Sequence, residues 1–165
     1  MRPSTVLTIR IVFASVGLFV GLFTGICFAA HFRNYNAAVW AIVSGLFAAA
    51  VLWLHVKYKR LTLRQWLPRL RNLMLVGCVG QLAGFSAMVT YITLGIVMRQ
   101  GLSMIYGENF WVALVWGWMT WKWAFAMFYY SRLYRRHYIA EMQPKLPSGN
   151  EYDDDELPDQ HSARY

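Results

Sequence analysis

Four long apolar runs dominate the 165-residue sequence and alternate with short polar segments. Each run has about the 20 residues that a helix needs to cross a hydrocarbon core of ~30 Å. Three of the runs contain no charged side chain, and the fourth contains one, Lys122. The pattern therefore predicts an all-α membrane protein with four transmembrane helices. The predicted spans are residues 11–30, 37–56, 73–98 and 110–130.

The basic residues gather in the segments that would lie on one side of the membrane. The loop at 57–72 holds six Lys and Arg residues and no acid, and further Arg residues flank both ends of the four-run region. The opposite loops hold only Arg33 and Arg99. Because cytosolic loops accumulate Lys and Arg, we expect both termini and the basic loop in the cytosol, which requires an even number of spans.

The first run has an alternative interpretation as a secretory signal peptide, because Arg2 precedes it. The run is longer than the core of a usual signal, which has about 7 to 15 residues. In addition, Gly17, Gly21 and Gly25 repeat every four residues. This spacing places glycine along one helix face and lets another helix approach closely in lipid. We therefore interpret the run as a retained span.

Composition and charge narrow the class of partners. The chain is 58% hydrophobic and only 15% charged, whereas soluble domains carry about 25% charged residues. The net charge of +8 would suit nucleic acid, but the cations cluster at one membrane face, so we expect anionic lipid of the cytosolic leaflet and no nucleic acid. Apolar side chains at helical spacing in the basic loop predict a short helix in the headgroup layer, which Pro68 would interrupt. They are Leu63, Trp66, Leu67 and Leu70.

The composition changes after the last run. Residues 137–165 include prolines and acids, and six of the eight acids of the chain lie between positions 151 and 159. We expect a disordered, acidic cytosolic tail there, behind a transmembrane domain at 1–136. A signal that binds a sorting adaptor and a merely solvated tail both fit this composition.

Polar side chains inside an apolar run are the first candidates for function, because placing them in a membrane is costly. His55 could bind a metal or a heme iron through a neutral imidazole, or it could be an interfacial histidine that bonds to lipid or water. Lys122 could pair with a flat, apolar anion inside the bundle or extend its amine toward the headgroups. The aromatic residues of the fourth run suit either simple packing or a wall for a macrocycle.

Missing residue types exclude several functional classes. No Asp or Glu lies in any run, although small proton-coupled drug exporters need a membrane-embedded carboxylate. His55 is the only histidine in a run, whereas bis-histidine cytochromes need pairs. The Cys-x-x-Cys of quinone-reducing thiol enzymes is also missing. No catalytic constellation remains, so we do not expect an enzyme.

Three segments resemble a known family, the heme-responsive-gene transporters, a solute-carrier family of small eukaryotic heme carriers. They are residues 52–58 (LWLHVKY), 106–111 (YGENFW) and 121–125 (WKWAF). The likeness extends over residues 9–136 and excludes the tail. It implies four spans with cytosolic ends and the import of heme into the cytosol across the plasma membrane or an endosomal or lysosomal membrane. Heme is then the transported substrate, and no catalytic cofactor is expected.

The resemblance also suggests which residues contact heme. His55 aligns with the family's second-span histidine and becomes a candidate axial ligand of the heme iron. The family motif of an aromatic residue, Ala, Arg, Lys and Tyr aligns with 130–134, where Ser131 and Leu133 depart from it. The motif positions that are kept are Tyr130, Arg132 and Tyr134. Arg132, and with it Lys122, would attract the heme propionates, because guanidinium binds carboxylates bidentately.

The second outer loop, residues 99–109, departs further from the family, because it lacks the histidine that members can carry there. The candidate outer ligands are instead Tyr106, Met104 and His31, and the sequence does not rank them.

Four spans are few for a complete pathway, so we expect a homo-oligomer with the glycine face of the first span among its contacts. The alternatives are a tetraspan scaffold or trafficking adaptor without a substrate, and an accessory subunit of a larger membrane complex. Heme titration and co-purification would discriminate them.

Overall fold

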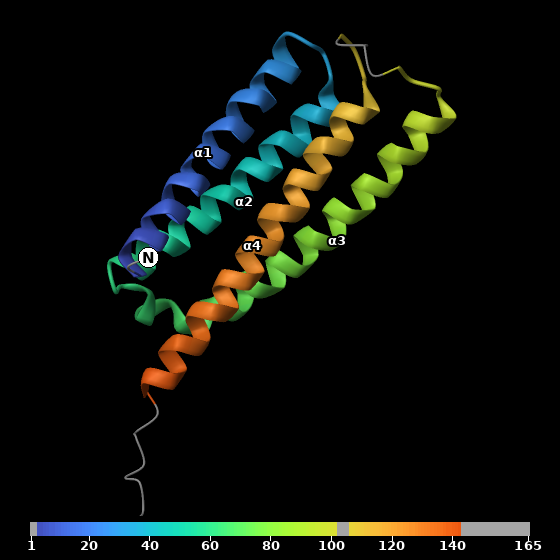
Figure 1. Ribbon diagram of the computed structural model, residues 1–165. Coiled ribbons are helices and arrows are strands. Elements are labelled where there is room, and N and C mark those ends of the chain that lie inside the picture. Colours follow the sequence, from blue (N-terminus) through green and yellow to red (C-terminus); the bar gives the residue numbers. More distant parts are fainter. Residues whose placement is uncertain (1–2, 102–105, 143–165) are drawn as a thin grey trace, which may run out of the picture.

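The computed structural model describes residues 3–101 and 106–142, and these residues form a set of long helices (Figure 1). They are α1 (Pro3–Ala30), α2 (Tyr35–Lys59), α3 (Leu67–Val97) and α4 (Phe110–Met142), with the short 3-10 helix η1 (Leu63–Trp66) before α3. Three stretches are long and apolar enough to cross a membrane: Thr5–Ala30, Tyr35–Lys59 and Leu63–Val97. The prediction of an all-α membrane protein is therefore confirmed.

Several predicted boundaries move because helices continue beyond the apolar runs. The short loop helix exists as η1, and Pro68 does not interrupt it, since Pro68 stands in the first turn of α3, where proline is tolerated. α3 thus begins six residues before the predicted span. α4 has 33 residues and a length of about 50 Å, and it continues to Met142. The predicted tail, residues 137–165, thus overlaps the last six residues of α4, and residues 143–165 lie outside the described part of the chain.

The helices lie side by side in the order α1, α2, α4, α3 (Figure 1). α2 and α4 pack against each other in the middle, α1 packs on α2, and α3 packs on α4. The two flanking helices consequently expose large apolar side chains, such as Phe19 on α1 and Leu82 on α3, each more than two-thirds accessible. Such surfaces are unusual on soluble monomers and suit contact with lipid.

The glycine face of α1 permits a close helix contact within the chain itself. A Cβ atom on Gly21 would lie 2.8 Å from the Cα atom of Gly45 in α2. A Cβ on Gly25 would lie 2.6 Å from the Ile42 side chain, and one on Gly17 would overlap the ring of Trp123 in α4. The predicted close approach is confirmed, but its partners are α2 and α4. The expectation that this face contacts another copy is therefore wrong.

The sequence analysis missed a second contact of this kind, between α3 and α4. A Cβ atom on Gly84 would lie 2.8 Å from the backbone nitrogen of Trp121, and one on Gly77 would lie 2.9 Å from that of Phe128. Small residues therefore set the spacing of both outer helices from their inner neighbours.

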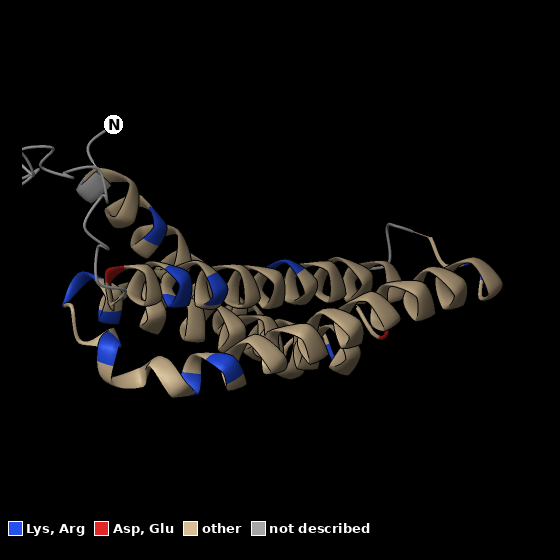
Figure 2. Ribbon diagram, turned by 90° about the horizontal axis from the view of Figure 1, so that it is seen from below, with Lys and Arg blue, Asp and Glu red and all other residues tan. Residues whose placement is uncertain are grey.

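Two groups of interactions hold the opposite ends of the row. At one end, Asn34 caps α2 by accepting from the Ala37 amide at 3.0 Å, and its own amide donates to the Asn109 carbonyl at 3.1 Å. Glu108 accepts from the Tyr35 amide at 3.0 Å, which joins the two loops of this end. At the other end lies the basic loop, and Figure 2 shows most Lys and Arg residues gathered there.

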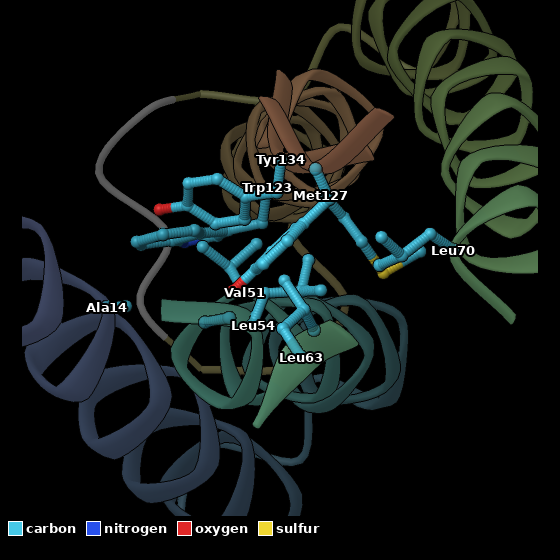
Figure 3. Close-up of a cluster of buried hydrophobic side chains, with 10 residues drawn as sticks. Ala14, Val51, Leu54, Leu63, Leu70, Trp123, Met127 and Tyr134 are labelled. Carbon is cyan, nitrogen blue, oxygen red and sulfur yellow. The ribbon is translucent and has the colours of Figure 1, made fainter. Parts of the chain in front are cut away.

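The main core lies in the half of the molecule nearer the basic loop (Figure 3). Side chains of α2 and α4 meet there, and residues of η1 and the start of α3 close this core at the end nearest the basic loop. The labelled members are Ala14, Val51, Leu54, Leu63, Leu70, Trp123, Met127 and Tyr134. This core fixes the positions of the neighbouring polar residues.

Candidate functional site

His55 lies in the last turns of α2 and is 1% exposed, between the inner helices rather than at a lipid-facing surface. The structure thus buries this side chain, whereas the alternative of an interfacial histidine has it bond to lipid or water. Its Nδ1 atom lies 2.7 Å from the hydroxyl oxygen of Tyr134 in α4. When Nδ1 carries the proton and donates it to this oxygen, the Nε2 lone pair is free. This is the usual arrangement of a metal-binding imidazole with a hydrogen-bonded partner behind it.

Three tyrosines on one face of α4 lie around this hydrogen bond. Tyr130, Tyr134 and Tyr138 are four residues apart and so lie on one helix face. The ring of Tyr130 meets the His55 ring edge to face at 4.5 Å between centroids. Tyr58 of α2 stacks on Tyr134 at 4.0 Å, nearly parallel.

A cavity of about 110 Å³ opens beside His55, between α1, α2 and α4. Two cations border it. Arg10 of α1 lies over Tyr130, with its guanidinium carbon 5.1 Å from the ring centre. The Lys122 amine lies 4.8 Å from the centre of the Trp123 ring and 5.1 Å from that of Phe13. The complete lining is Arg10, Phe13, Val51, His55, Lys122, Trp123, Ala126 and Tyr130.

The electrostatics of this cavity favour an anionic ligand. Glu108 and Glu141 are the only carboxylates in the described part of the chain, and neither lines the cavity. Arg10 and Lys122 are therefore held by aromatic faces, through cation–π contacts, and no carboxylate of the lining neutralises them. An imidazole, two cations and aromatic walls together can bind a flat anion that carries a metal.

The structure brings together four of the six predicted contact residues and separates two. His55, Tyr130 and Lys122 line the cavity, and Tyr134 supports His55. Arg132 is exposed and does not line it. Tyr106 lies at the opposite end of the molecule. Within the described ranges, no group of three or more His, Cys, Asp or Glu side chains is placed to hold a metal ion.

Arg10 is the functional candidate that the sequence analysis missed. A positive charge near the end of an apolar run is already expected from the pattern that sets membrane topology. The available signal was its place near the start of the first run, three residues before Phe13 and therefore on the same helix face. Only the packing of α1 beside α2 and α4 shows that it reaches Tyr130.

Two of the three candidate outer ligands lie in contact. The Tyr106 hydroxyl is 3.2 Å from Nε2 of His31, and both residues are exposed. The ring of Phe32 packs against Tyr106 and His31. The Gly107 amide donates to the Phe32 carbonyl at 2.8 Å and so fixes the two loops together. Met104 lies outside the described residues.

Comparison with known proteins decides the family. Residues 70–123 match the model of a family described as "Haem-transporter, endosomal/lysosomal, haem-responsive gene". The chain is 34% identical over 143 residues to "Heme transporter hrg-1" of Caenorhabditis elegans, an alignment that covers 85% of this chain and 73% of that protein. The chain belongs to the heme-responsive-gene family. The resemblance of the sequence to this family is thereby confirmed.

Two further relatives from Caenorhabditis elegans match over most of the chain. "Heme transporter hrg-6" is 25% identical over 151 residues, with 86% of this chain and 92% of that protein covered. "Heme transporter hrg-4" is 26% identical over 150 residues, with 78% and 80% covered. No solved structure matches the chain. The family match at 70–123 includes Lys122 and Trp123 of the cavity.

Proposed function

We propose that this protein is a heme transporter and that the cavity beside His55 is a binding site along the transport path of heme. Membership of the family and the names of three relatives support heme as the substrate. The observation that carries the proposal is the buried imidazole of His55, held at Nδ1 by Tyr134 and bordered by two cations without a carboxylate. The scaffold and adaptor alternatives need none of these features.

Each group in the cavity has a distinct role toward heme. The Nε2 atom of His55 binds the iron, because a neutral imidazole is a strong ligand for it. Arg10 and Lys122 attract the two propionates through charge-assisted hydrogen bonds. Tyr130 and Trp123 pack against the macrocycle. No covalent step is required, and the protein acts by binding and release.

The cavity must widen before it accepts heme. Its volume of about 110 Å³ is below the 300–1,000 Å³ of ordinary ligand pockets. α1 closes one side of the cavity through Arg10 and Phe13, and it packs mainly on α2. Movement of α1 away from α4 would therefore open the cavity while the pair of inner helices stays intact.

The two residues outside the cavity fit the ends of the path. Tyr106, with His31, presents two ligand types for iron at the outer end. Arg132 is exposed two residues beyond the predicted fourth span and would attract a propionate as heme leaves toward the cytosol.

We further propose that α4 is a fourth span and that both termini face the cytosol. The distribution of basic residues supports this orientation. Transport then runs into the cytosol from outside the cell or from an endosomal or lysosomal lumen. A homo-oligomer remains part of the proposal, but its contacts must use surfaces other than the glycine face of α1. An adaptor that binds the acidic tail is a separate proposal, because that tail lies outside the described residues.

The test compares the uptake of a fluorescent metalloporphyrin by cells that express the wild-type chain or His55→Ala. We expect uptake to fall at least tenfold, because removing the ligand itself should cost no less than the ~10-fold to 100-fold loss that follows from removing a hydrogen-bond partner behind a metal ligand. His137→Ala is the matched control, because His137 is exposed and lies outside the cavity. Wild-type uptake by His55→Ala, together with an unshifted Soret band in heme titration, would contradict the proposal and favour a scaffold.

A further inference from the structure

A second hollow lies on a different face of α2 from the His55 cavity and shares no residue with it. Trp53 and His55 are two positions apart, which points their side chains to different sides of the helix. The hollow has a volume of about 430 Å³ and lies between α2, η1 and the first turns of α3. Its lining is Ala50, Trp53, Trp66, Arg69, Asn72, Leu73 and Val76.

Two tryptophans and two cations frame the end of this hollow nearest the basic loop. Trp53 and Trp66 meet edge to face, with ring centroids 5.2 Å apart. The guanidinium carbon of Arg69 lies 4.5 Å from the centre of the Trp66 ring, and the Lys57 amine lies 5.9 Å from that of Trp53. Tryptophan rings prefer the depth of the lipid headgroups. The two tryptophans therefore place the positive charges of Arg69 and Lys57 at headgroup depth.

Polarity changes steadily along the hollow. A neighbouring hollow of about 300 Å³, lined by Gln65, Trp66 and Arg69, continues it on the polar side. On α3, Arg69, Asn72, Leu73 and Val76 are spaced so that they share one helix face. The surface thus passes from cationic and polar to wholly apolar along a single groove.

We propose that this groove binds one anionic phospholipid of the leaflet that faces the basic loop. The headgroup phosphate lies between Arg69 and Lys57, beside Gln65, and an acyl chain follows Leu73 and Val76. The basic loop contains no acid that would neutralise these cations. Basic pockets between helices at the cytosolic face are suited to anionic headgroups.

The same groove is poorly suited to heme. Its lining and that of the neighbouring hollow contain no His, Cys, Met or Tyr, so no side chain there is a usual ligand for heme iron. The proposal rests on the membrane orientation given above and is independent of heme transport by His55.

The test uses the full-length chain in detergent micelles and native mass spectrometry. Phosphatidylserine and phosphatidylcholine with identical acyl chains are added at equal concentrations. We expect one phosphatidylserine to remain bound where phosphatidylcholine has dissociated. Arg69→Gln should weaken phosphatidylserine binding about fivefold, the effect of one basic residue near an anionic lipid. Arg64→Gln is the matched control, because Arg64 is exposed in the same loop and lines neither hollow.

Equal binding of the two lipids, or equal losses from Arg69→Gln and Arg64→Gln, would overturn the proposal in favour of diffuse attraction. Displacement by soluble glycerophosphoserine would overturn the role of the apolar half of the groove. Displacement of the lipid by equimolar heme in the His55→Ala chain would assign the groove to heme instead. If Arg69→Gln fails to fold by circular dichroism, Val76→Trp fills the apolar half without a change of charge. This variant should retain less phosphatidylserine than the wild type, and unchanged retention would overturn the proposal.

Discussion

Tyr134→Phe is the sharpest test of the His55 site, because it removes one oxygen atom and keeps the ring. The lost hydroxyl lies 2.7 Å from Nδ1 of His55, and both side chains are at most 2% exposed. The stacking of Tyr58 on the Tyr134 ring, at 4.0 Å, does not depend on that hydroxyl. The substitution therefore isolates the hydrogen bond that orients the imidazole.

We expect this variant to bind heme 10-fold to 100-fold less tightly, about the effect of losing a hydrogen-bond partner behind a metal ligand. It should also lose about 1–3 kcal/mol of stability, because Nδ1 of His55 is left buried without its partner. Heme titration of the purified chain, read from the Soret band, measures the first effect. Thermal unfolding in the same detergent measures the second.

Tyr138→Phe is the matched control for this experiment. Tyr138 lies one turn further on the same face of α4, and its buried hydroxyl has no hydrogen-bond partner among the described residues. Its removal should leave heme affinity within about twofold of wild type, since no oriented group is lost. Wild-type heme affinity in Tyr134→Phe, or an equal loss in Tyr138→Phe, would refute the role assigned to the bond.

Three further changes test the packing and the cavity. Gly21→Leu should cost about 3 kcal/mol of unfolding free energy or more, because even a Cβ would lie 2.8 Å from the Gly45 backbone; an unchanged melting temperature would contradict the contact. Ser131→Ala should stabilise the protein by about 1 kcal/mol, because the hydroxyl of this buried serine lacks a partner in the described structure; a lower melting temperature would show a hidden bond. Arg10→Gln should reduce metalloporphyrin uptake about tenfold, the loss of one charged hydrogen bond, whereas Arg136→Gln, at an exposed position, should not; equal effects would indicate general charge attraction.

The sequence predicted the positions of the helices well and their ends poorly. An apolar run ends where the side chains leave the lipid. A helix can continue beyond that point, because its backbone hydrogen bonds do not depend on apolar side chains. α3 therefore begins at Leu67, with Pro68 in its first turn, and α4 continues to Met142 through polar residues. Hydropathy contains no information on such extensions.

For the site, the sequence identified the residues that are unusual at their positions. His55 and Lys122 stand out because polar groups are rare in an apolar run. Arg10 does not stand out, since an arginine at the end of a span is ordinary. Its contact with Tyr130 arises from the packing of α1, which no local pattern encodes. The glycine repeat likewise predicted a close contact, but it could not distinguish the neighbouring helix from another copy.

The small-residue contact between α1 and α2 has a mechanical consequence. The closest approach of this face to the α2 backbone, at Gly21, lies 11 positions along α1 from Arg10, a distance of about 16 Å at the rise of an α-helix. If α1 pivots there, a tilt of about 15° carries Arg10 roughly 4 Å sideways by the same geometry. The outer end stays fixed, since the loops joined by Glu108 and Gly107 hold it. The first helix would thus act as a lever that turns at Gly21, and the arm that bears Arg10 would open the cavity by separating Phe13 from Trp123.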